Sequence, residues 1–355
     1  MTVIPTNPLL GVGCHSVGAF FAANCYSPQK YIKRWSWEIY WLVQASWCWL
    51  LWPIIGALAT IPHIAAVLAE APKLLLLYSF LMGVAYGVGG TAFNISIRYI
   101  GYGLTYSIAV GLSSILGTLV PPLVRGQFAD ILTKTGSGWV LGGVAAGALG
   151  IFLCGLAGHF KERDLAAQTG SAGEFSMAKG LLLSLVAGAL SAVYGFALEV
   201  MAPVADIAQH YGAGIWRGNI AYPFANTGAF VTAAIYAGYL ARKNRSFGQL
   251  TEWRSRPERG RLSKNYLLAI LTGTLWYGQF FFYNLGHVRL GKEYAFSSWA
   301  IHMIMLVLFS NLVAMFFMEW KGCSARTKAV VGLGLVVLCA AVLSLTYGNY
   351  VGEHA

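Results

Sequence analysis

The sequence is poor in charged residues, and this scarcity sets its class. Only 10% of its 355 residues are Asp, Glu, Lys or Arg, while 57% are hydrophobic and the mean hydropathy is +0.61. That is too little polar surface to cover a soluble globule of this size. The composition therefore predicts a membrane protein that crosses the bilayer several times. Its net charge of +11 is better explained by membrane topology than by nucleic-acid binding.

Several kinds of site are also missing from the sequence. The six cysteines stand singly, with no CxxC or Cys/His spacing typical of a metal site or a disulfide framework, so we expect packing residues, no metal and no cofactor. A phosphate-binding loop is absent, which excludes direct ATP drive within this chain. No basic segment precedes the first apolar run, so we expect this run to remain as the first span rather than to be a cleaved signal peptide.

Ten stretches are long enough to cross a bilayer, which takes about 20 apolar residues in a helix. They are approximately Pro8–Tyr26, Glu38–Thr60, Lys73–Ile97, Gly103–Leu123, Trp139–His159, Ala178–Glu199, Gly218–Leu240, Tyr266–Gly286, Tyr294–Met318 and Thr327–Tyr347. The predicted fold class is therefore all-α, with ten transmembrane helices.

Lys and Arg are distributed unevenly over this predicted topology. Of the 24 basic residues, one side holds only Lys73, Arg125, Lys134, Arg217, Arg289 and Lys292. Because the cytoplasmic side carries the excess of Lys and Arg, both termini are predicted to be periplasmic. The most polar segment, from Arg242 to Lys264, is predicted to be a solvated topology anchor on the cytoplasmic side.

An internal repeat is indicated by two short patterns with the same spacing. They are Tyr86, Gly87 and Arg98 in the first half, and Tyr277, Gly278 and Arg289 in the second. Two halves of five spans each must be inverted relative to one another, which is typical of transporters with a site near the bilayer midplane. We predict a first repeat in 1–165, a cytoplasmic linker in 166–177 and a second repeat in 178–355.

Polar side chains inside the predicted spans indicate where a substrate binds, because polar groups in hydrocarbon usually face a cavity or a partner. The candidates are His15, Trp41, Gln44, Asn94, Trp276, Gln279, Tyr283, Asn284, Ser298, Trp299 and His302. Aromatic rings beside amides and hydroxyls suit a sugar, whose C–H faces stack on rings while its hydroxyls need hydrogen-bond partners. Interfacial or core packing is the alternative for the aromatic residues.

Four residues are candidates for coupling transport to a proton: Glu38, His302, His15 and Glu199. Imidazole is the side chain that titrates near neutral pH without perturbation. Glu38 has a second interpretation, as an acid stabilised by the dipole at the start of a helix. Glu199 stands beside a predicted outer loop.

Five stretches carry a resemblance to a known family: His15 to Pro28, Lys33 to Glu38, Arg98 to Gly101, Trp276 to His287, and Ser298 to Met303. Over most of its length the chain resembles the L-rhamnose–proton symporters, a branch of the drug/metabolite transporter superfamily. The resemblance implies ten helices, an inner-membrane location and proton-driven uptake of a 6-deoxyhexose, with a sugar, a proton and the lipid bilayer as partners. The Arg-rich segment and Glu199 depart from the family pattern, so the sugar and the proton carrier stay open, as does the oligomeric state.

Two other functions are compatible with parts of the sequence. The superfamily fold supports many substrates, so an exporter or exchanger of another metabolite is the first alternative. A membrane acyltransferase is the second, because His159 and Asp164 have an H-x4-D spacing. Their charged neighbours and the lack of further catalytic residues disfavour the enzyme.

Overall fold

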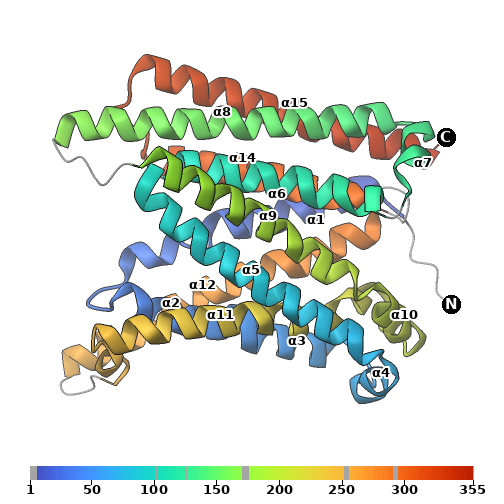
Figure 1. Ribbon diagram of the computed structural model, residues 1–355, viewed down its shortest axis with the longest axis horizontal. Helices are drawn as coiled ribbons and strands as arrows, with labels where there is room; N and C mark the ends of the chain where they lie inside the picture. Colours follow the sequence, from blue (N-terminus) through green and yellow to red (C-terminus); the bar gives the residue numbers. More distant parts are fainter. Residues whose placement is uncertain are drawn as a thin grey trace. The chain divides into compact units, whose positions relative to one another are not determined.

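The computed structural model describes residues 6–100, 102–124, 126–169, 176–251, 256–290 and 295–354, and these residues form helices and no strands. The elements in chain order (Figure 1) are α1 (Pro8–Asn24), η1 (Ser27–Tyr31), α2 (Trp37–Ala45), η2 (Ser46–Leu51), α3 (Trp52–Thr60), α4 (Ile64–Glu70), α5 (Lys73–Ile100), α6 (Tyr102–Val124), α7 (Phe128–Thr133), α8 (Ser137–Thr169), α9 (Met177–Glu199), α10 (Ala202–His210), η3 (Gly214–Ile220), α11 (Tyr222–Lys243), η4 (Phe247–Leu250), α12 (Arg256–Arg289), η5 (Ala295–Ser297), α14 (Ser298–Phe316) and α15 (Ala325–His354).

Eight segments of the described chain are long and apolar enough to cross a membrane. They are Pro8–Tyr31, Trp37–Thr60, Lys73–Ile97, Leu104–Val124, Ser137–Leu165, Ala178–His210, Ser298–Phe316 and Ala325–Glu353. They coincide with eight of the predicted spans, and the protein is an α-helical, multi-pass membrane protein. The other two predicted spans lie in α11 and α12, which are continuous helices of 22 and 34 residues. Amide, hydroxyl and charged side chains make these two helices less apolar.

The helices form two compact units, and neither unit is a continuous half of the sequence. Unit 1 consists mainly of Asn24–Val88 and Ala197–Phe281, whereas unit 2 consists of Val3–Ala23, Gly89–Phe196 and Phe282–Ala355. Two long helices, α5 and α12, contribute residues to both units. Each unit therefore contains helices from both predicted repeats.

The core of unit 2 lies where α14 packs against α8 and α15. Gly136 of α8's leading turn lies against Gly348, and Cys154 lies against Gly334, so α8 and α15 run side by side in opposite directions (Figure 1). Ile304 of α14 is fully buried in this core. Small residues at these contacts let the backbones approach closely, which stabilises helix pairs in lipid by van der Waals packing.

In unit 1, the second predicted span is built from three consecutive helical segments. A π-helical turn, η2, separates α2 from α3, and Pro53 follows at the start of α3. Proline has no N–H and its ring clashes with the carbonyl four residues earlier, here that of Trp49. The wider π turn absorbs this clash without ending the helix. α11 packs beside both α2 and η2.

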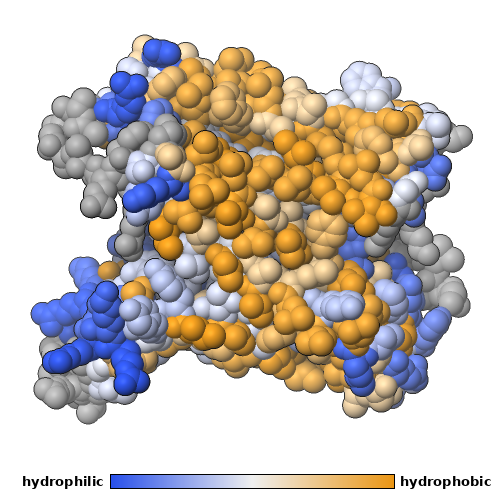
Figure 2. Space-filling view, viewed as in Figure 1, coloured by the Kyte–Doolittle hydropathy of each residue, from blue (hydrophilic) through white to orange (hydrophobic). Residues whose placement is uncertain are grey.

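The polar segment predicted as a solvated anchor is partly helical. α11 continues to Lys243 and α12 already begins at Arg256, because Lys, Arg and Glu are good helix formers even outside the bilayer. Figure 2 shows charged side chains gathered where α11 leads into η4, and apolar ones over the middle of α11. Within the predicted linker 166–177, α8 extends to Thr169, and residues 170–175 lie outside the described chain, as do 252–255.

Candidate functional site

Five side chains of unit 2 form a continuous group of rings, which we call the histidine cluster: His15, Tyr283, His287, Trp299 and His302. Tyr283 lies at its centre, with ring centroids 5.2 Å from His15, 5.4 Å from His302, 5.8 Å from Trp299 and 6.0 Å from His287. The rings of His15 and His302 are themselves 5.9 Å apart. Three helices, α1, α12 and α14, thus bring four predicted residues together.

Hydrogen bonds fix two members of the histidine cluster. The Nδ1 atom of His287 lies 3.1 Å from the hydroxyl oxygen of Ser298, and the indole N–H of Trp299 donates to the carbonyl of Ser113 at 3.1 Å. The polar atom of Trp299 is therefore already used by the protein. What Trp299 offers a ligand is its ring surface.

Glycines on two helices make room for the cluster. A Cβ atom on Gly286 would lie 2.7 Å from Cδ2 of His15 and 2.8 Å from the carbonyl oxygen of Gly11, so α12 approaches α1 this closely only with glycine there. A Cβ atom on Gly117 of α6 would lie 2.5 Å from the Trp299 ring. These two positions therefore determine where the rings of His15 and Trp299 can lie.

The histidines are buried, although imidazole is polar. His15 is 0% exposed and His302 is 1% exposed. Neither ring nitrogen of His15 has a hydrogen-bond partner among the described residues. A buried polar group without a partner costs roughly 1 to 3 kcal/mol, so its retention points to a ligand as the missing partner.

Unit 1 contains a second group of rings, which we call the tryptophan cluster: Trp37, Trp41, Trp49, Trp276 and Phe280. Trp41 is stacked on Trp37 at 5.1 Å and meets Trp49 edge-on at 5.8 Å. Trp49 in turn contacts Trp276 at 5.2 Å, and Trp276 contacts Phe280 at 4.8 Å. α2, η2 and α12 supply these rings.

Buried polar groups without a partner also occur in unit 1. Gln44 is 1% exposed, and neither its amide nitrogen nor its amide oxygen has a hydrogen-bond partner among the described residues. The same holds for the indole nitrogen of Trp49, which is 5% exposed. Gln44 lies two residues before the π turn that contains Trp49, and π turns occur frequently at functional sites.

The remaining predicted residues are distributed over both units. Gln279 in unit 1 and Asn284 in unit 2 are each 5% exposed. The amide of Asn94 donates to the carbonyl of Gly90 one turn earlier in α5, at 2.9 Å, and no described contact links it to either cluster. Glu199 is the partly buried last residue of α9.

Glu38 lies in the first turn of α2 and is buried. Its Oε1 atom accepts hydrogen bonds from the amide of Asn244, at 3.0 Å, and from the hydroxyl of Ser246, at 2.8 Å. These contacts tie the turn after α11 to the start of α2. They favour the structural interpretation of Glu38, while its coupling role stays a prediction.

Four residues of the clusters were not among the predicted site residues: Trp37, Trp49, Phe280 and His287. His287 lies four residues after Tyr283 and therefore on the same face of the helix, so its place in the cluster could have been predicted from the sequence. Trp49 lies in the π turn, which helical periodicity does not predict.

Asp164, one of the two residues that suggested an acyltransferase, caps the start of a helix. Asp164 Oδ2 accepts hydrogen bonds from the backbone N–H of Ser324, at 2.9 Å, and from the hydroxyl of Thr327, at 2.7 Å. It therefore satisfies donors at the beginning of α15. His159 contacts the neighbouring ring of Phe160, at 6.2 Å between centroids.

Comparison with known proteins identifies the family. Residues 6–349 match the model of the L-rhamnose-proton symport protein (RhaT) family. The L-rhamnose-proton symporters of Salmonella gallinarum and Salmonella paratyphi A are each 33% identical to this chain over 336 residues, which is 94% of this chain and 95% of theirs. The chain belongs to the L-rhamnose-proton symport protein family, and it is therefore a transporter and not an enzyme.

Proposed function

We propose that this protein takes up L-rhamnose, or a closely related 6-deoxyhexose, together with a proton. The curated relatives are named for this activity, and the histidine cluster provides the chemistry that it requires. The observation that carries the proposal is the buried contact between His15 and His302 beside Tyr283 and Trp299. Imidazole takes up and releases protons near neutral pH.

The histidine cluster suits a deoxyhexose as well as a proton. Ring faces and edges at Trp299 and Tyr283 offer surfaces for the C–H groups and the methyl group of the sugar. The nitrogens of His15 are buried groups whose missing hydrogen bonds a sugar hydroxyl would supply. In the tryptophan cluster, Trp276 and Trp49 with Gln44 form a second candidate surface for sugar contact.

Coupling would follow from the cost of burying charge. A protonated, sugar-loaded site and an empty, neutral site would be the two forms that pass between outward-open and inward-open states, because an imidazolium is expensive in a membrane interior unless the oxygens of a bound sugar accept its hydrogen bonds. Alternating access then moves sugar and proton together. His302 and His15 are the preferred proton carriers, and Glu38 and Glu199 are the remaining candidates.

We further propose ten spans arranged as two inverted repeats of five, as in the drug/metabolite transporter superfamily. α11 and α12 would be the seventh and eighth spans. The antiparallel pairing of α8 with α15, the fifth and tenth predicted spans, supports the inversion. A second support is that α5 and α12, which are both divided between the units, are the third span of each repeat. They pass from unit 1 to unit 2 at similar places, after Val88 and after Phe281.

The proposed membrane is the bacterial inner membrane, with both termini in the periplasm. The distribution of Lys and Arg supports this orientation, because α11 ends in Arg242 and Lys243 and leads into the most basic segment of the chain. Single cysteines placed in that segment should be labelled by a membrane-impermeant reagent only from the cytoplasmic side.

The proposed function is tested in proteoliposomes with an imposed pH gradient, acidic outside. Radiolabelled L-rhamnose should accumulate only while the gradient lasts, and a proton ionophore should abolish accumulation. L-mannose, which carries a hydroxyl group where L-rhamnose has a methyl hydrogen, should compete more weakly, because the hydroxyl would be buried against ring surfaces. Rhamnose accumulation that does not depend on the pH gradient would contradict symport. If unrelated metabolites inhibit rhamnose uptake as strongly as unlabelled rhamnose does, the alternative of an exporter or exchanger of another metabolite would be favoured.

A further inference from the structure

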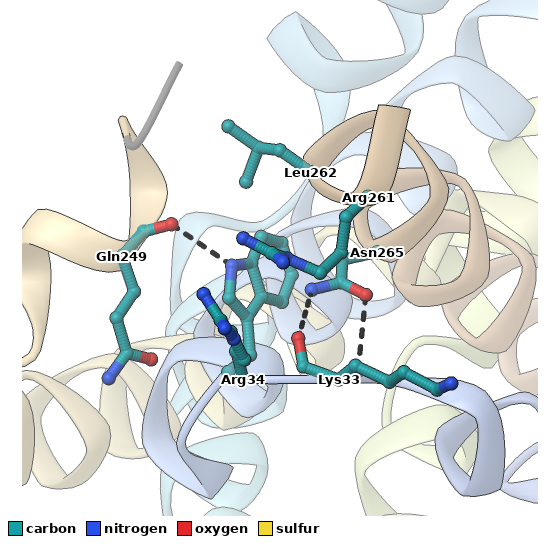
Figure 3. Close-up of a pocket in the computed structure, with 7 residues that line it drawn as sticks. Lys33, Arg34, Gln249, Arg261, Leu262 and Asn265 are labelled. Carbon is teal, nitrogen blue, oxygen red and sulfur yellow. Dashed lines mark hydrogen bonds between the residues drawn. The ribbon is translucent and has the colours of Figure 1, made fainter. Parts of the chain in front are cut away.

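Polar side chains in this protein are used in two different ways. Around a small hollow of unit 1, where α12 and η4 meet the segment before α2, they hold the backbone in place (Figure 3). Asn265 donates to the carbonyl of Lys33 at 2.8 Å and accepts from its N–H at 3.3 Å. The indole N–H of Trp35 donates to the carbonyl of Gln249 at 3.0 Å. The three imidazoles of the histidine cluster in unit 2 form a different arrangement, which is ordered by depth.

The outer edge of the histidine cluster lies where three helices of unit 2 begin or end. The backbone N–H of Asn7, just before α1, donates to the carbonyl of Arg289, the last residue of α12, at 2.9 Å. The Nδ1 atom of His287, in the last turn of α12, lies 3.1 Å from the hydroxyl oxygen of Ser298, the first residue of α14. The start of α1, the end of α12 and the start of α14 therefore lie at one level.

The three imidazoles lie at different depths below this level. An α-helix rises about 1.5 Å per residue, so His287 lies about 3 Å from the end of α12, His302 about 6 Å from the start of α14, and His15 about 10 Å from the start of α1. Burial follows the same order, because His287 is partly buried, whereas His302 is 1% exposed and His15 is 0% exposed. His287 is therefore the imidazole of the cluster that lies nearest to the helix ends.

Ring contacts connect His287 with the two buried imidazoles. The ring of Tyr283 is stacked on that of His287, at 6.0 Å with 20° between the planes. The same tyrosine ring meets His15 and His302 edge-on, at 5.2 and 5.4 Å. A Cβ atom on Gly286 would lie 2.8 Å from Nε2 of His15, so this nitrogen lies against the turn of α12 that carries His287.

Few side chains at this level can exchange a proton near neutral pH. Apart from the three histidines, the titratable or charged residues of α1, of α14 and of the last two turns of α12 are Cys14, Tyr283 and Arg289. A thiol and a phenol release their protons only at alkaline pH, and arginine keeps its proton. Imidazole is the group that both binds and releases a proton near pH 7.

We propose that His287 is the residue through which the transported proton enters from the periplasm and reaches His15 or His302. Its imidazole takes one proton from a hydronium ion, which becomes water, and is then an imidazolium. It gives one proton to a neutral imidazole of the buried pair and becomes neutral again. The hydroxyl of Ser298 fixes the ring of His287, so Ser298 is a positioning residue. This inference rests on the proposed function and orientation, because only a proton-coupled carrier needs such a relay.

The test compares two kinds of rhamnose transport by the full-length protein in proteoliposomes. Gradient-driven uptake requires net entry of protons, whereas exchange of labelled for unlabelled rhamnose without a gradient does not. The variants are His287→Ala and His287→Gln. His210→Ala is the matched control, because His210 is an exposed histidine at the end of α10 in unit 1, outside the histidine cluster. Imidazole in the outer solution serves as a diffusible replacement for the missing ring.

We expect gradient-driven uptake to fall about tenfold in both His287 variants, because a positioned acid–base group is lost from the path of the proton. Exchange should be unchanged. Imidazole should restore gradient-driven uptake in His287→Ala and should have no effect on His210→Ala. Melting temperatures check that the variants are folded, and His287→Gln, which keeps a polar side chain beside Ser298, carries the test if His287→Ala does not fold.

Two results would overturn the relay. The first is gradient-driven uptake by the folded His287 variants at the rate of His210→Ala. The second is a loss of exchange together with uptake, because His287 would then serve sugar binding or the transport cycle itself. A wild-type protein that accumulates no rhamnose under the gradient would instead contradict the proposed function, so the two failures are distinguishable.

Discussion

The two ring clusters resemble each other in packing but differ in chemistry. The histidine cluster of unit 2 combines three imidazoles with one phenol and one indole, whereas the tryptophan cluster of unit 1 consists of indoles and a phenyl ring. Only the first contains imidazole, the side chain whose unperturbed pKa lies near neutral pH. We therefore expect substitutions in the histidine cluster to weaken proton coupling and substitutions in the tryptophan cluster to weaken sugar binding. The following variants test this expectation.

The largest expected effect comes from the two buried histidines. Replacing His15 or His302 by Asn keeps a polar side chain but removes the titrating group, so gradient-driven rhamnose uptake should fall roughly 100-fold. Exchange of labelled for unlabelled rhamnose without a gradient should persist, because it needs no net proton movement. If both variants keep full gradient-driven uptake, neither His15 nor His302 is the proton carrier.

Gly286→Ala tests the close approach of α12 to α1. The added methyl group would meet His15 and the backbone of Gly11, so we expect a loss of about 1 to 3 kcal/mol in stability, and weaker coupling as His15 is displaced. Gly13→Ala is the control on α1, since a Cβ there meets nothing within 4 Å. Melting temperatures in detergent compare the stability of the two variants. Equal melting temperatures for Gly286→Ala and Gly13→Ala would contradict the packing described for unit 2.

Trp49→Phe sharpens the role of the tryptophan cluster. Phenylalanine keeps an aromatic ring but loses the indole N–H and part of the contact with Trp276, which is worth about 1 kcal/mol. The KM for rhamnose should therefore rise about fivefold, with the maximal rate and the pH dependence of uptake unchanged. A change in the pH dependence of uptake would show that the tryptophan cluster also contributes to proton coupling. Phe20→Leu in unit 2 serves as a control for the loss of an exposed ring.

The smallest effect is expected at Glu38. Glu38→Gln keeps an oxygen that accepts from Asn244 and Ser246, so coupled uptake should stay within about twofold of wild type if the residue only ties two segments together. Gradient-driven uptake of rhamnose measures this. If gradient-driven uptake is lost in this variant, Glu38 in unit 1, and not the histidine cluster of unit 2, would be the proton carrier.

The sequence predicted the helices well wherever apolar runs were long. The eight candidate spans follow from length and hydropathy alone, and His15 and His302 stand out because ionisable groups are rare in such runs. α11 and α12 are the informative exception. The same Gln, Asn and His side chains that mark α12 as part of a site also make it less apolar than a typical span.

Other features could not be read from the chain. Periodicity assumes a regular helix, so it places Gln44 and Trp49 on different faces and misses the π turn between them. The division into two units is equally hidden, because it falls inside helices such as α5 and α12, where no loop marks a boundary. The distribution of the candidate residues between the units required coordinates.

The π turn in the second span has a consequence for insertions and deletions. Such a turn accommodates one residue more than a regular α-helical turn, and each residue of an α-helix corresponds to a rotation of about 100°. Deleting one residue between Ser46 and Leu51 would therefore leave a regular helix with Trp37 and Trp41 still on the same side relative to α3, but it would bring back the clash between the ring of Pro53 and the carbonyl four residues before it. We expect such a deletion to lower the stability of this helix rather than to redirect the side chains of Trp37 and Trp41.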